Sequence, residues 1–98
     1  MAEQESAFLN FLLQTNKSQI KALLSHATLS QIQALIEVAY NARFSSLDQD
    51  LVNNLKPYKH LIRKLTDDKL STTQRRRLVS RRAQSIFNIV HLMKDRLP

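Results

Sequence analysis

Apolar residues recur along this chain at intervals of three and four, the spacing that places side chains on one face of an α-helix. The clearest example is residues 29–44, where Ile32, Leu35 and Ile36 share one such face. The alternation of apolar and polar residues that marks β-strands is missing. Helices are predicted for residues 3–14, 17–26, 29–44, 47–65 and 72–96. The pattern therefore predicts an all-α fold, a compact bundle of about five helices with a long basic C-terminal helix.

The predicted helix starts share a local signal, a side chain that can cap the helix followed three residues later by glutamine. In such a capping box the first side chain accepts a hydrogen bond from the amide of the third helical residue, and the glutamine accepts one from the amide of the capping residue. Four pairs fit this spacing, Asn16 with Gln19, Thr28 with Gln31, Ser46 with Gln49, and Ser71 with Gln74. Each pair opens an apolar-periodic stretch, so together they support the predicted starts.

Pro57 interrupts the predicted helix over residues 47–65. Proline has no amide hydrogen to donate and its ring clashes with the preceding turn, so we expect a kink or break near residues 54–56. We expect Pro57 to restart the helix at its first position. Residues 66–70 are predicted to form a loop. Because all connections are short, neighbouring helices should pack roughly antiparallel.

The composition excludes several classes of site. The chain has no cysteine, which removes disulfides, iron–sulfur clusters and thiolate zinc sites, and no glycine, which argues against phosphate-binding loops and dinucleotide folds. His26, His60 and His91 fall in different predicted helices, and none has the i, i+4 partner of a metal-binding helix. No serine stands in a nucleophile motif. We therefore expect a single domain over residues 1–98 that is not an enzyme and binds no metal or cofactor.

Three features bear on location. No apolar run approaches the roughly 20 residues that a membrane span needs. Residues 1–6 contain two glutamates and no basic residue, the reverse of a signal peptide. Arg63-Lys64, followed after ten residues by Arg75-Arg76-Arg77, fits a two-part nuclear import signal. We expect an intracellular protein without a transmembrane segment, which is not secreted.

Charge is distributed unevenly along the chain. Residues 1–55 carry three basic and five acidic side chains, a net charge of −2, whereas residues 56–98 carry twelve basic and three acidic side chains, a net charge of +9. This asymmetry predicts a mildly acidic packing half, residues 1–55, and a basic contact half, residues 56–98.

Five arginines lie within residues 75–82, at the beginning of the last predicted helix. The helix dipole places partial positive charge at this end, so each added cation costs up to a few tenths of a kcal/mol. Arg77 and Arg81 also repel each other across one turn. A bound anion reverses the sign of these terms, and both helix-start amides and arginine side chains suit phosphate. The cluster therefore indicates an anionic partner.

Nucleic acid is the anion that we favour, and DNA rather than RNA. The sequence has no helix-turn-helix recognition helix, RNA-binding aromatic motif or zinc finger, so contacts to the phosphate backbone without sequence reading are expected. An acidic partner protein is the alternative. The predicted contact residues are Lys56, Lys59, Arg63, Lys64, Arg75, Arg76, Arg77, Arg81 and Arg82.

The second part of the last predicted helix carries a different pattern. Apolar residues are spaced alternately four and three apart, as in a coiled-coil heptad, and from Ile86 to Met93 the helix is apolar nearly all round. The domain buries this segment, a second copy covers it, or it contacts a membrane surface. An oligomer interface is predicted for Val79, Ala83, Ile86, Phe87, Val90, Met93 and Leu97.

Several segments resemble one protein family. They are residues 27–41, ATLSQIQALIEVAYN, followed by Leu55-Lys56, Lys59-His60, residues 62–65 and residues 71–79. This pattern is similar to small basic proteins encoded by Maverick-type and adintovirus-type DNA viruses and by their integrated copies in animal genomes. The resemblance implies a virus-encoded protein associated with the particle or its genome, and it supplies no active-site residues. Those proteins go on to a lysine-rich segment and a glycine-containing apolar tail, where this chain has arginines and a predicted helix.

Two functions follow as expectations. The first is a non-enzymatic protein that binds the nucleic-acid backbone, packages a viral genome or belongs to the virion core, and acts in the nucleus or the virion. The alternative is a structural or adaptor protein, such as a minor capsid component or a homo-oligomer, which docks through its C-terminal helix.

Overall fold

The computed structural model describes the backbone of residues 3–97 and the side chains of residues 6–97, and every regular element in this part is helical. The elements are α1 (Glu3–Gln14), α2 (Ile20–Ser25), α3 (Leu29–Phe44), α4 (Gln49–Leu55), the 3-10 turn η1 (Lys56–Tyr58), α5 (Lys59–Leu65), α6 (Thr72–Arg81), α7 (Ala83–Leu92) and the 3-10 turn η2 (Lys94–Arg96). The predicted all-α fold is confirmed.

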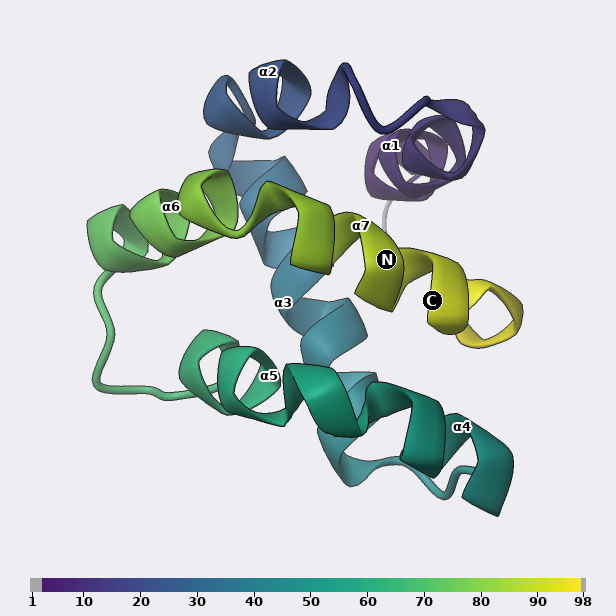
Figure 1. The fold of residues 1–98 in the computed structure, drawn as a ribbon. Coiled ribbons are helices and arrows are strands. Elements are labelled where there is room, and N and C mark those ends of the chain that lie inside the picture. Colours follow the sequence, from purple (N-terminus) through teal and green to yellow (C-terminus); the bar gives the residue numbers. More distant parts are fainter. Residues whose placement is uncertain (1–2, 98) are drawn as a thin grey trace.

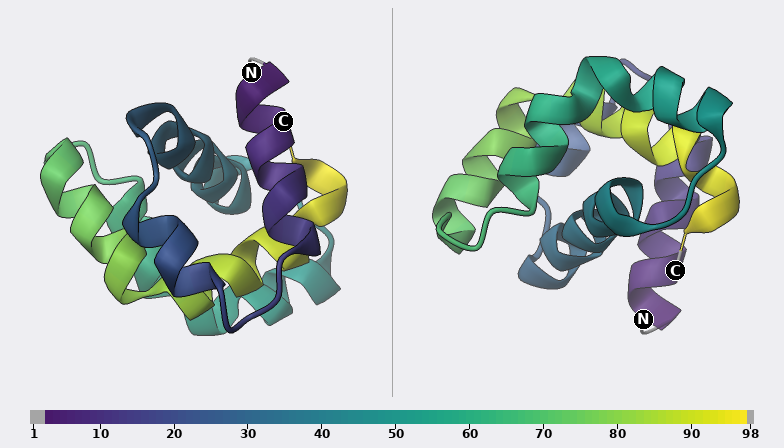
Figure 2. Two further views of the ribbon diagram at one scale, coloured as in Figure 1. Left: turned by 90° about the horizontal axis from the view of Figure 1, so that it is seen from above. Right: turned by 90° about the horizontal axis from the view of Figure 1, so that it is seen from below.

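Helix α3 runs through the middle of the fold, where it contacts α1, α5, α6 and α7. In Figure 1 the segment from α4 to α5 runs in one direction and the segment from α6 to α7 returns in the other. Figure 2 shows the same elements from above and below, with α1 lying across α7. The helices fill a body of 34 × 31 × 27 Å. The two segments are joined by the short loop between α5 and α6, and their antiparallel arrangement agrees with the prediction made from short connections.

The buried hydrophobic side chains form one cluster, and both halves of the chain contribute to it. Residues 1–55 supply twelve of these side chains and residues 56–98 supply ten. The expected division into a packing half and a contact half is therefore corrected. The basic half also packs, because its apolar residues lie between the basic ones at helical spacing and face inward.

The side chains predicted to form an oligomer interface lie inside the core of a single chain. They are Val79, Ala83, Ile86, Phe87, Val90, Met93 and Leu97, of which only the last is half-buried and the others are buried. This corrects the interface prediction for these residues, because α7 is surrounded by α1, α2, α3 and α4 of the same chain. None of the helices in the described part of the chain is long and apolar enough to cross a membrane.

Two of the four predicted capping boxes are formed. Thr28 Oγ1 accepts a hydrogen bond from the Gln31 amide at 3.2 Å, and Gln31 Oε1 accepts one from the Thr28 amide at 2.9 Å. Ser71 and Gln74 repeat this exchange at 3.1 and 2.7 Å. These two boxes fix the starts of α3 and α6, the helices that carry much of the candidate site described below.

The other two predicted boxes are wrong. Asn16 lies outside α2, and its side chain accepts a hydrogen bond from Ser18 instead. Before α4, Asp48 takes the place predicted for Ser46, because its carboxylate accepts a hydrogen bond from the Leu51 amide at 2.8 Å. A carboxylate is also favoured at the positive end of a helix, so Asp48 is the better cap.

The predicted break at Pro57 is confirmed. Helix α4 ends at Leu55, and the next three residues form η1 with the proline in its first positions. Helix α5 begins at Lys59 and not at Pro57 as predicted, because the proline lies within η1. The segment is therefore split into two short helices.

The last helix bends at Arg82, where one helix over residues 72–96 was predicted. Arg82 leaves the helical region with φ −113° and ψ 34°, and the chain passes into η2 from Lys94 onward. Both segments contact α2 and α3, but the bend lets α6 also contact α5 whereas α7 also contacts α1 and α4. Neither proline nor glycine is present here, so packing rather than a local signal accounts for the bend.

Candidate anion-binding surface

Helix α5 and the turn before it carry a row of exposed basic side chains. Lys59 and Arg63 are one helical turn apart, and so are His60 and Lys64, so the two pairs lie on neighbouring edges of the helix. We call these four side chains, together with Lys56 of η1, the basic ridge. The opposite face of α5 is buried and fixes the orientation of the ridge through Leu61, Ile62 and Leu65.

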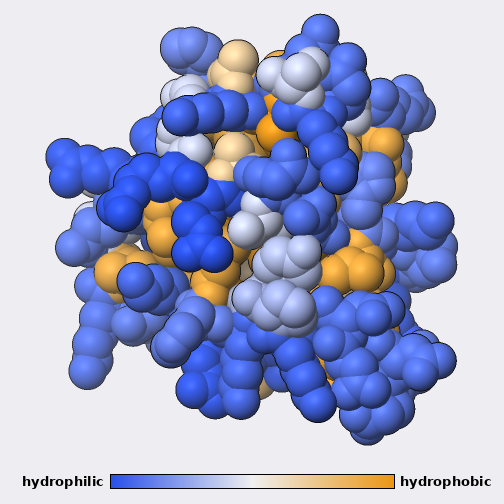
Figure 3. Space-filling view, in the orientation of Figure 1, coloured by the Kyte–Doolittle hydropathy of each residue, from blue (hydrophilic) through white to orange (hydrophobic). Residues whose placement is uncertain are grey.

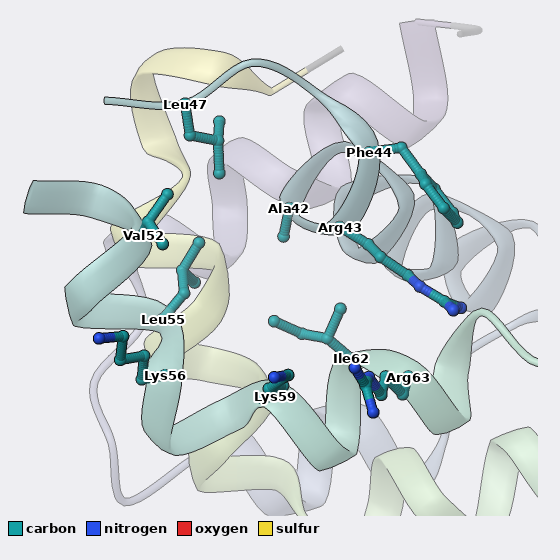
Figure 4. A pocket seen from close by; sticks show the side chains of 10 residues that line it. All are labelled: Ala42, Arg43, Phe44, Leu47, Val52, Leu55, Lys56, Lys59, Ile62 and Arg63. Atoms are coloured by element: carbon teal, nitrogen blue, oxygen red, sulfur yellow. The ribbon is translucent and has the colours of Figure 1, made fainter. Parts of the chain in front are cut away.

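One flank of the basic ridge borders a pocket of about 390 Å³ between the end of α3, α4 and α5, shown in Figure 4. The apolar side chains that line it are Ala42, Phe44, Leu47, Val52, Leu55 and Ile62. The basic side chains that line it are Arg43, Lys56, Lys59 and Arg63. Within the described part of the chain no acidic residue lines this pocket, so a hydrophobic interior is combined with charged groups that are all cationic.

Arg43 and Phe44 form the α3 wall of this pocket. The Arg43 guanidinium donates a hydrogen bond to Thr66 Oγ1 at 2.9 Å, and its Cζ lies 4.8 Å from the centre of the Phe44 ring. Tyr40 stacks on the same ring, with the two centroids 5.7 Å apart. These contacts hold the Phe44 ring in place although 65% of the residue is exposed.

The other flank of the basic ridge faces α6 and its junction with α7. His60 and Lys64 line a smaller pocket of about 240 Å³ together with Leu61, Leu78 and Arg82. The fold thus brings together Lys64 and Arg82, which were both predicted to contact nucleic acid. Figure 3 shows that hydrophilic side chains cover most of this face of the molecule and leave only small apolar areas between them.

The arginine cluster divides into two groups. Arg75 and Arg76 are half-buried and are bound to the chain's own backbone. Nη2 of Arg75 donates a hydrogen bond to the Asp67 carbonyl at 2.6 Å, and Nη1 of Arg76 donates one to the Ala27 carbonyl. These two arginines therefore have a structural contact that the sequence did not predict. The exposed members of the cluster are Arg77, Arg81 and Arg82.

The acidic loop between α5 and α6 is tied to α3. The Tyr40 hydroxyl donates a hydrogen bond to Asp68 Oδ1 at 3.1 Å. This hydrogen bond, with lesser effects of desolvation and of the Asp68 charge, raises the pKa of Tyr40, while Arg75 and Arg43 oppose the shift. Tyr40 consequently remains a donor at neutral pH. Neither Asp67 nor Asp68 lines either of the two pockets beside the basic ridge.

No family model, curated protein or solved structure matches the chain. Within the described residues, no group of three histidine, aspartate or glutamate side chains is arranged to hold a metal ion. The surface offers positive charge and an apolar cavity.

The sequence predicted part of this surface. Lys56, Lys59, Arg63 and Lys64 are exposed on the basic ridge, as a contact role requires. Three further residues that line its pockets were missed, Arg43, Phe44 and His60. A signal for two of them was present, because a basic residue and an aromatic residue adjoin at the end of α3, just before two serines.

Proposed function

We propose that this chain is a non-enzymatic protein that binds the phosphate backbone of nucleic acid. The observation that carries the proposal is that α5 and α6 are in contact and both carry exposed basic side chains. Among the described residues, no acidic side chain lines either pocket beside the basic ridge. Lysine and arginine at such a surface displace the counterions of a polyanion and gain affinity from their release. The proposed contacts are Lys56, Lys59, Arg63, Lys64, Arg77, Arg81 and Arg82.

The form of the surface favours contact with phosphates over reading of bases. Helix α5 has seven residues and packs against both α3 and α6, so it does not stand clear of the bundle as a groove-reading helix does. The two arginines nearest the start of α6 are turned to the chain's own carbonyls. Binding is therefore expected with little sequence preference, and we favour DNA as the nucleic acid.

The resemblance to small basic proteins of Maverick-type and adintovirus-type viruses supports a setting for this activity. In that setting the chain condenses or packages a viral genome, in the nucleus or in the virion core. A positively charged surface without a helix that contacts the bases is suited to this task, because packaging requires binding to DNA of any sequence.

The test is fluorescence anisotropy of a labelled duplex of about 20 base pairs, titrated at several salt concentrations. We expect similar affinities for unrelated sequences and a slope of log K against log salt near −0.9 for each phosphate contact. Lys64→Gln/Arg82→Gln should make the slope shallower by up to about two units. The matched control is Lys17→Gln/Lys94→Gln, which removes the same charge from exposed lysines that line neither pocket. Equal losses in the two double variants, or no binding by the native chain, would contradict the proposal.

A structural or adaptor role is the second candidate, and one observation favours it. Most apolar residues of the C-terminal helix are buried, so they offer little surface for docking. The pocket beside Phe44 is an apolar surface that remains open.

A further inference from the structure

The pocket between α3, α4 and α5 gathers apolar side chains that the fold leaves uncovered. Among the described side chains, four large hydrophobic residues are exposed, and two of them, Phe44 and Val52, belong to the lining of this pocket. An exposed apolar surface surrounded by polar residues is typical of a binding site. The volume of about 390 Å³ falls in the range of sites that hold small ligands or single anchoring side chains.

The interior of the pocket selects for an apolar group. Leu47, Leu55 and Ile62 supply aliphatic surface, and no uncharged polar side chain lines the pocket. A polar group placed there would lose its hydrogen bonds to water without replacing them, which disfavours its entry. The inserted part of an occupant is therefore a large apolar side chain, such as leucine or phenylalanine.

The rim of the pocket selects for negative charge. Arg43 stands on one side, and Lys56, Lys59 and Arg63 stand on the other, as Figure 4 shows. Because no carboxylate among the described side chains lines the pocket, anions on an occupant would meet these cations directly. The required chemistry combines an apolar anchor with flanking carboxylates.

Two other occupants fit less well. A second copy of this chain carries a net charge of +7, so its approach to a cationic rim is opposed over long range. A nucleobase would bring polar edges into an interior with no uncharged polar partner. Its stacking surface is also limited, because Arg43 and Tyr40 already contact the Phe44 ring.

We propose that this pocket docks an acidic, amphipathic segment of another protein. A large apolar side chain of that segment enters between Phe44, Val52 and Ile62, and its aspartates or glutamates pair with the basic rim. This site goes beyond nucleic-acid binding and does not depend on it. Lys56, Lys59 and Arg63 belong to both proposed sites. The other proposed nucleic-acid contacts do not line the pocket and stay free, so the chain would be able to link a polyanion to an acidic protein; they are Lys64, Arg77, Arg81 and Arg82.

The experiment starts with a random peptide library displayed on phage and selected on the full chain. We expect the recovered peptides to combine several acidic residues with at least one leucine, phenylalanine or tryptophan. One recovered peptide is then labelled and its affinity is measured by anisotropy. Phe44→Ala should weaken binding about tenfold or more, as loss of an anchoring contact does. The matched control is Phe11→Ala, because Phe11 is an exposed phenylalanine of α1 outside the pocket, and it should change affinity less than about twofold.

The role of the basic rim is tested with the same peptide and the Lys56→Glu/Lys59→Glu variant of the chain, which should bind the peptide about tenfold or more weakly. The proposal is overturned if selection yields no binders or no enrichment of acidic residues, or if Phe44→Ala and Phe11→Ala behave alike. It is also overturned if single-stranded DNA displaces the peptide and loses affinity with Phe44→Ala, which would assign the pocket to a base. If the native chain self-associates in sedimentation experiments and Phe44→Ala abolishes this, the pocket would be assigned to a second copy of the chain. Failure to bind duplex DNA would leave this result intact.

Discussion

Arg76 donates a hydrogen bond from Nη1 to the carbonyl oxygen of Ala27, and so joins the start of α6 to the end of α2. Ala27 lies between the end of α2 and Thr28, the cap of α3, and its carbonyl accepts this hydrogen bond from a charged donor. Such charge-assisted hydrogen bonds are stronger than those between neutral groups. The same arginine stands at the positive end of its own helix, where it costs free energy, and the long-range contact offsets that cost.

This geometry predicts opposite effects for two pairs of arginines. Arg75→Gln/Arg76→Gln should lower the free energy of unfolding by about 2 kcal/mol, because hydrogen bonds from charged donors to two carbonyls are lost. Arg77→Gln/Arg81→Gln should leave stability unchanged or raise it by a few tenths of a kcal/mol, because an exposed i, i+4 repulsion is removed. Urea denaturation of both variants is the measurement. Equal stability of the two variants would show that the contacts to Asp67 and Ala27 contribute little.

The caps give a second prediction, with controls built into the chain. Thr28→Ala, Ser71→Ala and Asp48→Ala should each destabilise the fold by about 1 kcal/mol, since each removes an acceptor for a helix-start amide. Ser46→Ala and Asn16→Ala should have effects near zero, because neither side chain caps a helix. Thermal unfolding of the five variants tests the set. A loss for Ser46→Ala as large as that for Asp48→Ala would contradict the assignment of the cap.

The features that the sequence predicted are local ones. Thr28 and Ser71 each find their partner three residues along the chain, and the break at Pro57 follows from the chemistry of one residue. The bend at Arg82 has no such marker, because it arises from the different neighbours of α6 and α7. The alternating apolar spacing in the last helix fits burial as well as it fits a coiled coil, so spacing alone did not settle what covers Ile86.

The candidate site shows the same limit. Runs of basic residues revealed Lys59 and Lys64, because a short amphipathic helix exposes them whatever its neighbours are. The contacts of Arg75 and Arg76 join residues distant in sequence, so composition could not distinguish them from Arg77. The pocket beside Phe44 needs three helices to define it and had no signature in any one segment.

Tyr40 and Asp68 give a prediction on pH. Because the hydrogen bond to Asp68 raises the pKa of Tyr40 above its ordinary value of 10.0, its contribution to stability is full below that value and is lost as pH rises through the raised pKa. Asp68→Asn should lower the pKa of Tyr40, because an amide does not disfavour the phenolate as a carboxylate does. Ultraviolet titration of tyrosinate in the native and variant chains measures the change. An unchanged titration curve would contradict the proposed contact.

The last prediction concerns Ile86, which is 2% exposed in the core. Ile86→Asp should unfold the chain, because an unpaired carboxylate would be buried among apolar side chains and an aliphatic contact would be lost as well. The control is Leu29→Asp, a change at a residue that is 51% exposed, which should leave the helical circular dichroism spectrum unchanged. Sedimentation analysis of both variants and of the native chain completes the test. The contradicting outcome is a native chain that is oligomeric and an Ile86→Asp variant that is monomeric and still helical. That result would place Ile86 in an interface between copies and would overturn the packing of α7 described above.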